Sequence, residues 1–476
     1  MSKSALKNAE KARRYKIKKK MRKAAEKEKR HEESKRKRKE WKEKLALMTE
    51  GRIGDSKKRG QAWKTGRFGV GFNFMYHLSD LPSFVSGKYV VLFDPHCKFL
   101  PRVCAAKPGK RIGFVSSSAL QRHKDQFAPY IAFGCDMQNP YDGTLFRFPL
   151  RSVQQAEDSR LSRQSYTEDD MSSLLYELYL EAVPAMLFLK NIEVIEIYDW
   201  QEGASDPSRV YSCQVQSVSA EIRWHRQAFA RLSMAQVAPN KGSSPVPNHD
   251  IFGLDFTSEV YSGVHKGIRR SESFLISQCM GATASRIGAL AQNAAKDYDL
   301  HLVPWASIAA NVSSDGTKVQ NAMEGRAFCF LPLPAKTGLP VHVNGYFELS
   351  SNRRDIWYGQ DMDRGGKLRS DWNVCLLEDV VASAFAQLLL EASRRLGHSS
   401  LYYSLWPTGN FSEPWLTLVR RLFSSVAELP VLHTPTGGGK WVSPVQALYH
   451  DEEFSDAENL AKALVAEGLP LVRVSF

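Results

Sequence analysis

Apolar residues recur along this chain at two different spacings, which predict a mixture of strands and helices. Val70, Phe72, Phe74, Met75 and Leu78 are spaced as on a buried helix. Runs of β-branched and aromatic residues follow, with turn residues between them, as in a sheet. We therefore expect strands at residues 88–94, 131–133, 144–150 and 191–200, with helices over one face of the sheet that they form.

The same alternation continues to the end of the chain. A helix is expected to begin at residues 168–170, with a buried stripe made by Leu174, Leu175, Leu178 and Val183. Residues 371–395 have the widest apolar face and predict the clearest helix, which Gly397 ends. Further strands are expected at 211–218, 221–224, 259–261 and 326–333, a helix at 415–429 and a hairpin turn at 434–441.

These elements predict the α/β class and a chain of several parts. At 476 residues the length suits more than one domain. We expect a basic helical or disordered tail at 1–50, an α/β domain at 51–200, a second α/β domain at 201–398 and a C-terminal α/β segment at 399–476.

A glycine-rich stretch is the first candidate for a binding site. Gly66, Gly69 and Gly71 form a G-x-x-G-x-G turn directly before the first apolar run. Glycines allow backbone N–H groups to converge on a phosphate, and the N-terminus of a helix adds a favourable dipole. The same spacing occurs in ordinary tight turns, so spacing alone leaves both interpretations open.

Positive charge is concentrated in the first fifty residues. The formal charge of the chain is +14, and residues 1–50 hold 21 Lys or Arg against 8 Glu, a difference of +13. This segment lacks Gly and Pro, so it favours a solvated helix or a disordered tail. The basic run at residues 35–39 also fits a nuclear-localisation signal or a patch for RNA phosphates. A nucleic-acid partner would therefore bind through residues 1–50.

Composition argues against several other classes. The seven cysteines are scattered and contain no C-x-x-C pair, so neither a disulfide framework nor a zinc site is expected, and adjacent His96 and Cys97 are assigned no metal. No stretch reaches the roughly 18 uninterrupted apolar residues of a membrane span, and the charged start is unlike a signal peptide. We expect a cytoplasmic location, with the nucleus as the alternative, and no membrane partner.

Three separated blocks resemble the sacsin family. They are GRFGVGFNFMYHLSDLPSFVSGKYVVLFDPH at 66–96, DGTLFRFPLR at 142–151 and FCFLPLPAKTGLPVHVNGYFELSSNRRDIW at 328–357, within a resemblance that covers about residues 51–390. Sacsin-like proteins are large cytosolic chaperone-like proteins whose repeats begin with an ATPase-type domain similar to that of heat shock protein 90. The resemblance implies a partial Bergerat-type two-layer α/β sandwich of the GHKL ATPases.

The resemblance also implies a site for ATP and Mg. The G-x-F-G-V-G-F core is similar to the ATP lid, which makes Gly66, Gly69, Val70, Gly71 and Phe72 the implied nucleotide-binding residues. Thr144 stands at the position of a strand threonine in the hydrogen-bond network around adenine, although a plain strand role is the alternative for it.

Two arginines of the third block extend this implied site. Arg353 or Arg354 falls where a loop of the second domain sends an arginine to the γ-phosphate, and arginine suits that contact because its planar fork meets phosphate oxygens. A surface ion pair of Arg354 with Asp355 or Asp361 is the alternative.

The chain departs from GHKL ATPases before Gly66. Those enzymes carry a Glu and an Asn on an early helix and then an Asp-x-Gly-x-Gly turn, and neither motif is present here. No catalytic residue is therefore assigned, and hydrolysis by this chain alone is not expected. The predicted function is a chaperone-type or protein-interaction module, either degenerate or an incomplete piece of a longer protein. Its expected partners are client or co-chaperone proteins, among them the seventy-kilodalton heat shock chaperone system.

Two alternatives remain from the sequence. One is an ATPase completed by another chain or by upstream sequence, and the other is a nucleic-acid-associated protein that binds through its basic tail.

Overall fold

A computed structural model describes residues 71–114, 122, 124–237, 249–263, 265–282, 284–298, 300–313, 323–350, 352–359, 366–450 and 463–473. The chain divides into two compact units inside one helix: the described part of unit 1 ends at Met171, and that of unit 2 begins at Ser172. The basic tail and Gly66, Gly69 and Val70 lie outside the described residues.

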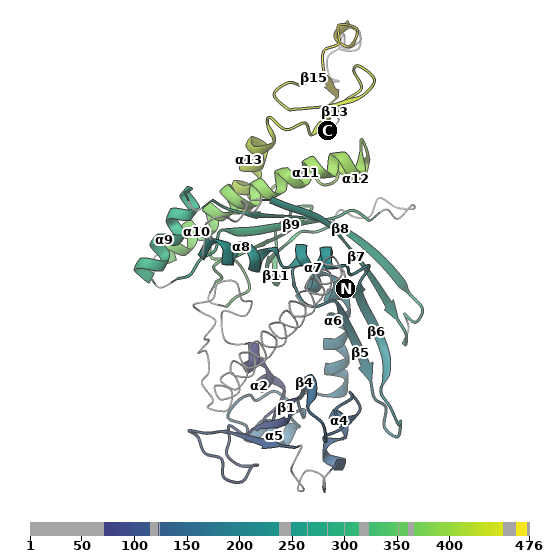
Figure 1. Cartoon of the computed structure of the whole chain (residues 1–476), viewed down its shortest axis with the longest axis vertical. Coiled ribbons are helices and arrows are strands. Elements are labelled where there is room, and N and C mark those ends of the chain that lie inside the picture. The colour runs from purple at the N-terminus through teal and green to yellow at the C-terminus, as the bar shows by residue number, and fades with distance from the viewer. Residues whose placement is uncertain are drawn as a thin grey trace, which may run out of the picture. The chain divides into compact units, whose positions relative to one another are not determined.

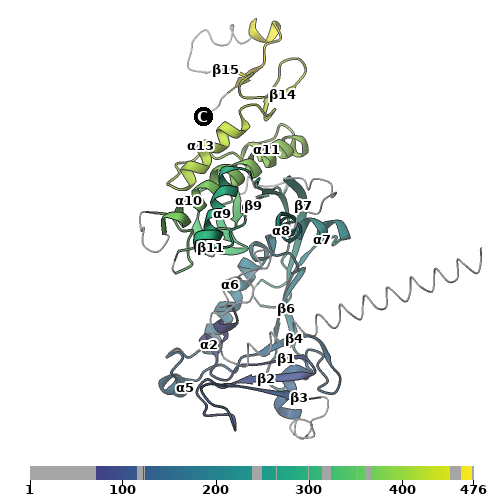
Figure 2. The ribbon, with the colours of Figure 1, turned by 60° about the vertical axis from the view of Figure 1, so that its left-hand side comes forward.

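Unit 1 is built on a four-stranded sheet with the order β3-β2-β1-β4 (Figure 2). The strands are β1 (Ser83–Gly87), β2 (Tyr89–Phe93), β3 (Gly109–Gly113) and β4 (Tyr141–Arg147), and each neighbouring pair is antiparallel. Alternate residues of β1 face opposite sides: Val85 packs in a cluster with Tyr130, whereas Phe84 packs in another with Met75. Both faces of this small sheet therefore bury apolar side chains.

Short helices cover the two faces of this sheet. The glycine-rich run ends in η1 (Gly71–Phe74) and α2 (Met75–Leu78), and η2 (Lys124–Phe127) leads into α4 (Ala128–Ile131). The strand expected at 131–133 is therefore wrong. Pro129 in the first turn of α4 suits a helix start, and the hydroxyl of Tyr130 lies 2.7 Å from that of Ser83, which fixes this helix against β1. A capping box between Ser152 and Gln155 begins α5 (Val153–Asp158).

Unit 2 is built on an eight-stranded sheet with the order β11-β10-β12-β9-β8-β7-β6-β5 (Figure 1). Apart from the parallel pair β10 and β12, neighbouring strands are antiparallel. The strands are β5 (Val194–Asp199), β6 (Ser208–Val215), β7 (His249–Val260), β8 (Arg269–Met280), β9 (Trp305–Asn311), β10 (Arg326–Cys329), β11 (Leu331–Lys336) and β12 (His342–Gly345).

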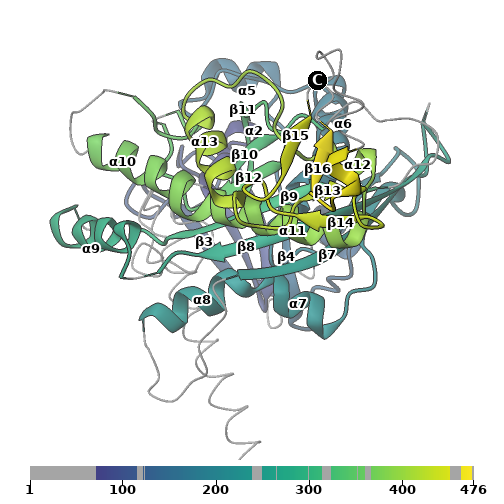
Figure 3. The same ribbon diagram turned by 90° about the horizontal axis from the view of Figure 1, so that it is seen from above.

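Helices cover both faces of the large sheet. The end of α6 (Glu168–Leu187), α7 (Ala220–Arg226) and α8 (Ala228–Val237) lie on one side. The other side carries a continuous helical stretch made of α10 (Gly366–Leu376), the π-helical turn η4 (Leu377–Val381) and α11 (Ala382–Leu396), which crosses the strands in Figure 3. Gly397, with φ of 62°, ends it as predicted.

The stretch Gly366–Leu396 is long and apolar enough to cross a membrane, and it is the one such stretch in the described part of the chain. However, 67% of its most apolar segment is buried inside the protein. Phe385, Leu388 and Leu389 are fully buried in the core of unit 2. Its composition is therefore accounted for by its place in this core.

The remaining elements complete unit 2. They are α9 (Arg286–Tyr298), α12 (Ser400–Tyr403), α13 (Trp415–Val426), the hairpin of β13 (Leu432–Thr434) and β14 (Lys440–Val442), and the parallel pair of β15 (Leu448–His450) and β16 (Leu471–Arg473). The hairpin predicted at 434–441 is confirmed. Gly437, Gly438 and Gly439 all have positive φ in its loop, which suits residues without a Cβ.

The α/β class is confirmed, but two local predictions are wrong. Residues 221–224 lie in α7 instead of a strand, because the Ser219 hydroxyl accepts a hydrogen bond from the Ile222 N–H and caps the helix. In α6, Val183 is buried as predicted, whereas the three expected core leucines are exposed: Leu174 by 43%, Leu175 by 38% and Leu178 by 39%. Only the C-terminal part of α6 packs on the large sheet.

Candidate functional site

The structure describes two of the five predicted lid residues. Gly71 and Phe72 form the start of η1, directly before α2 in unit 1. Gly66, Gly69 and Val70 lie outside the described residues. The phosphate contacts implied for this stretch remain a prediction.

Thr144 lies on β4 of unit 1, opposite Ser86 of β1. Its hydroxyl donates to the Ser86 hydroxyl over 3.0 Å, and the Ser86 hydroxyl donates to the Gly143 carbonyl over 2.9 Å. Thr144 is exposed, and its hydroxyl proton is engaged within the sheet. The adenine contact implied for it remains a prediction.

Arg353 and Arg354 lie in an exposed loop of unit 2 between β12 and α10. The loop is closed by a β-bridge between Leu349 and Ile356, and the buried Asn373 amide donates to the carbonyls at both ends of it, Glu348 and Trp357. The carboxylate of Asp355 accepts from the Ile356 N–H over 2.7 Å, and Asp361 lies outside the described residues. The γ-phosphate role stays a prediction, because the other implied site residues belong to unit 1.

Unit 1 contains a buried ion pair that the sequence did not reveal. The side chain of Arg151 is fully buried, and its Nε and Nη2 donate to Asp80 Oδ1 over 3.0 and 2.8 Å. The guanidinium also donates to the carbonyls of Tyr76, His77 and Gln164. All five hydrogen bonds lie between 2.8 and 3.0 Å, so the arginine joins α2 to the chain that follows α5.

The pKa of Asp80 is lower than usual as a net result of opposed causes. Burial raises it, but hydrogen bonds from Arg151 and Ser159 and the charges of Arg151 and His96 outweigh burial. The carboxylate is therefore ionised at neutral pH and serves as the counter-ion of Arg151.

A cavity of about 210 Å³ lies beside this ion pair. Its wall includes Asp80, Asp158 and Ser159 together with His96 and Lys98. Ser159 Oγ donates to Asp80 Oδ1 over 2.9 Å and lies 3.4 Å from His96 Nε2, and the same nitrogen lies 3.5 Å from Asp80.

This arrangement does not make a nucleophile of Ser159. Activation requires the serine proton to point at the imidazole, with the carboxylate on the opposite ring nitrogen. Here the serine proton goes to Asp80, and Asp80 and Ser159 approach the same His96 nitrogen. The described residues also contain no group of three or more side chains that could hold a metal ion.

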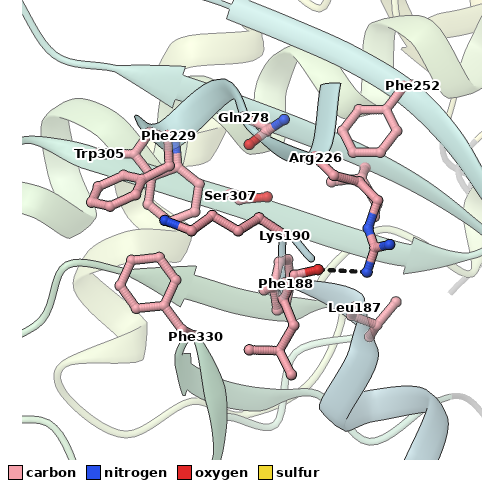
Figure 4. Close-up of a pocket in the computed structure, with 12 residues that line it drawn as sticks. Leu187, Phe188, Lys190, Arg226, Phe229, Phe252, Gln278, Trp305, Ser307 and Phe330 are labelled. Carbon is pink, nitrogen blue, oxygen red and sulfur yellow. Dashed lines mark hydrogen bonds between the residues drawn. The ribbon is translucent and has the colours of Figure 1, made fainter. Parts of the chain in front are cut away.

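Unit 2 contains a second pocket, on the face of the large sheet that α7 and α8 cover (Figure 4). Strand alternation places Trp305 and Ser307 of β9 and Gln278 of β8 on the same face, since Gln278 pairs with Ser307. The rest of the wall comes from the end of α6 and the residues after it (Leu187, Phe188, Leu189, Lys190), from Arg226 and Phe229 of α7 and α8, and from Phe252, Ile276 and Phe330.

Arg226 is the central charged group of this pocket. It is only 7% exposed, and its Nη2 donates to the carbonyls of Met186, Leu189 and Ile192 just beyond the end of α6. Burial lowers the pKa of Arg226, partly offset by the charge of Glu193, but a guanidinium stays protonated in proteins. A buried positive charge therefore lies against the wall of the pocket.

The sequence gave little signal for these residues. Asp80 and Arg151 are 71 positions apart, so local spacing could not join them, although both fall in the blocks that carry the family resemblance. Arg226 directly follows the stretch wrongly expected to be a strand. A charged residue beside apolar runs was the one hint at either position.

Comparison with known proteins relates this chain to sacsin. Residues 47–212 match the family model described as Sacsin domain. Sacsin from Homo sapiens is 29% identical to the chain over 345 residues, which amount to 72% of this chain and 7% of sacsin. The chain thus corresponds to a small part of the length of that relative. Both matches support a relationship to the sacsin family.

Proposed function

We propose that this chain acts as a sacsin-type protein-interaction module of chaperone character, with an incomplete or degenerate nucleotide site. The relationship to sacsin supports the family part of this proposal. Unfolded or partly folded client proteins and co-chaperones, including the seventy-kilodalton heat shock system, are the proposed partners, in the cytoplasm. The observation that carries the proposal is the exposed apolar surface of α6.

The exposed surface consists of five large apolar residues in the middle of α6. They are Leu174, Leu175, Tyr176, Leu178 and Leu180, each between 38% and 52% exposed. On a helix, Leu174 and Leu178 are neighbours, as are Tyr176 and Leu180. We call this set the α6 apolar surface.

Such a surface is unusual for a helix that has all its partners. A helix with apolar residues all round is normally buried, and contiguous exposed apolar patches mark sites of protein interaction. Fully burying one leucine contributes about 1.5–3 kcal/mol, so covering several of them would supply a useful binding free energy. Because apolar contact is non-directional, the surface suits varied unfolded segments more than one shaped ligand.

The incomplete nucleotide site is the second part of the proposal. The Glu and Asn motif and the Asp-x-Gly-x-Gly turn are missing before Gly66. Without them there is no general base and no specific partner for adenine. ATP and Mg are therefore proposed at most as weak ligands of the lid stretch.

The experiment measures suppression of aggregation. Citrate synthase is heated with the full chain, and light scattering is followed over time. We compare Leu174→Glu with Leu178→Glu as a double variant against Ser172→Glu with Ser173→Glu. The serine pair is a matched control, because it adds the same charge to exposed positions of the same helix.

We expect the wild-type chain and the serine variant to suppress scattering and the leucine variant to lose most of that effect. Circular dichroism verifies that both variants keep their helix content. If the wild-type chain gives no suppression in molar excess, or if the leucine variant is as active as the serine variant, the α6 apolar surface is not a client site. Calorimetry with ATP and Mg tests the other part: tight binding that Gly69→Ala or Gly71→Ala abolishes would contradict an incomplete site.

A further inference from the structure

The pocket around Arg226 in unit 2 carries unmatched positive charge. Arg226 and Lys190 both line it, and none of the described residues in its wall is acidic. The nearest carboxylate that affects Arg226, that of Glu193, is already held by Arg223 through two hydrogen bonds of 2.7 and 3.1 Å. A buried cation without a paired anion is costly, so this environment favours an anionic ligand.

Several buried hydrogen-bond donors of the pocket wall are also unused. Within the described part of the chain, Arg226 Nε and Nη1, Trp305 Nε1 and Ser307 Oγ are buried and have no hydrogen-bond partner. Buried polar groups are nearly always paired in folded proteins. Three of these four atoms can only donate, and so the missing partner is an acceptor.

The shape of the pocket limits the size of that partner. The space open to the centre of a water-sized sphere is about 20 Å³, slightly more than the 10–15 Å³ that one water needs. The walls include the flat rings of Phe188, Phe229, Trp305 and Phe330. Figure 4 shows the Lys190 side chain running across the pocket between Ser307 and Phe330, with Nζ 6.0 Å from the Phe229 ring centre. A small planar anion fits these walls better than a tetrahedral phosphate.

We propose that this pocket binds a carboxylate group. Arg226 is held ready by the three carbonyls that its Nη2 contacts, so little side-chain entropy is lost on binding. Lys190 supplies the second positive charge, and the Trp305 indole and Ser307 hydroxyl supply neutral donors. The group comes either from a free small acid or from the C-terminus of a peptide. This inference is independent of the α6 apolar surface.

The test uses the indole N–H of Trp305 as a reporter. The full chain is labelled with ¹⁵N at tryptophan, and its signal is identified by its loss in Trp305→Phe. Sodium formate is titrated at constant ionic strength against sodium chloride, and formamide serves as a neutral molecule of the same shape. N-acetylglycine, which carries the same group on a peptide-like stem, separates the two sources: its binding indicates a peptide terminus, and its exclusion indicates a free small acid.

We expect the Trp305 signal to shift saturably with formate but not with formamide or chloride. Lys190→Gln should weaken formate binding roughly tenfold, because a charge-assisted contact is lost. Lys336→Gln is the matched control, since Lys336 is an exposed lysine of the same unit that pairs with Glu324. No saturable shift, an equal shift with chloride, or unchanged binding in Lys190→Gln would overturn the proposal.

Discussion

Replacing Arg151 by Met should destabilise unit 1 more than any other single change to its polar groups. The fully buried guanidinium makes five hydrogen bonds, two of them to Asp80. Methionine has a similar length but no donor. The Asp80 carboxylate and three backbone carbonyls would therefore lose their partner inside the protein.

The magnitude follows from the burial of the pair. Removing one partner of a buried ion pair costs about 3–5 kcal/mol, because the other charge stays buried without compensation. The whole stability of a domain is about 5–15 kcal/mol. Arg151→Met should therefore leave unit 1 close to unfolding. Arg151→Lys should cost less, since an ammonium keeps the charge but cannot make all five contacts.

Hydrogen exchange is the suitable assay, since a chain with two units does not unfold as one step. The free energy of opening is read from peptides that contain β1 and β2. Arg151→Met should lower this free energy by several kcal/mol and leave the peptides of α11 in unit 2 unchanged. The double variant Arg151→Met with Asp80→Leu should recover part of the loss, because it removes the unpaired carboxylate as well.

Acid should reveal the same pair. The pKa of Asp80 is lower in the folded state than in the unfolded chain. Its ionisation therefore stabilises the fold above the unfolded pKa, about 3.9, and this contribution is lost as the pH falls through the folded value. Unchanged exchange of β1 and β2 in Arg151→Met, or a double variant no more stable than the single one, would refute this account of the ion pair.

Two further predictions concern unit 2. Burial lowers the pKa of His342 to about 4, and its Nδ1 accepts from the Arg326 N–H, so the folded state holds the neutral ring. Because the unfolded histidine titrates near 6.5, unit 2 should lose up to about 3 kcal/mol between that pH and 4. His342→Gln should remove this part of the pH dependence of exchange in β12, and a slope unchanged by the variant would contradict it. Gly325→Ala should prevent folding of unit 2, because its Cβ would lie 2.2 Å from the Val341 carbonyl oxygen. Gly409→Ala, whose Cβ meets nothing closer than 3.8 Å, is the control, and solubility with circular dichroism compares the two; a soluble, folded Gly325→Ala protein would show that the backbone yields there.

The sequence by itself determined the elements whose signal is local. The helix expected at 371–395 appears as the continuous stretch Gly366–Leu396, because its apolar face repeats over many turns and Gly397 supplies the stop. The turn at residues 437–439 is equally local, since three glycines tolerate the positive φ that it needs. The resemblance of three blocks to the sacsin family agrees with the comparisons for the same reason: it is a property of the residues themselves.

The tertiary structure alone decided which apolar positions are buried. Leu174 and Leu178 in α6 have the spacing of a core stripe, yet only the later turns of that helix pack on the large sheet. Spacing says which residues share a face, whereas burial depends on what covers that face. The strand expected at 221–224 failed for a related reason, because the cap at Ser219 outweighed a weak alternation.

The charged groups of both pockets were also decided by tertiary contacts. Arg151 meets Asp80 across 71 residues, and Arg226 meets the carbonyls at the end of α6 across 34 to 40 residues. A charge is buried only where distant segments bring it partners, and these partners carry no periodic signal in the sequence. The sequence therefore determined the family relationship and the regular elements, and the packing of distant segments determined the ion pair and the Arg226 pocket.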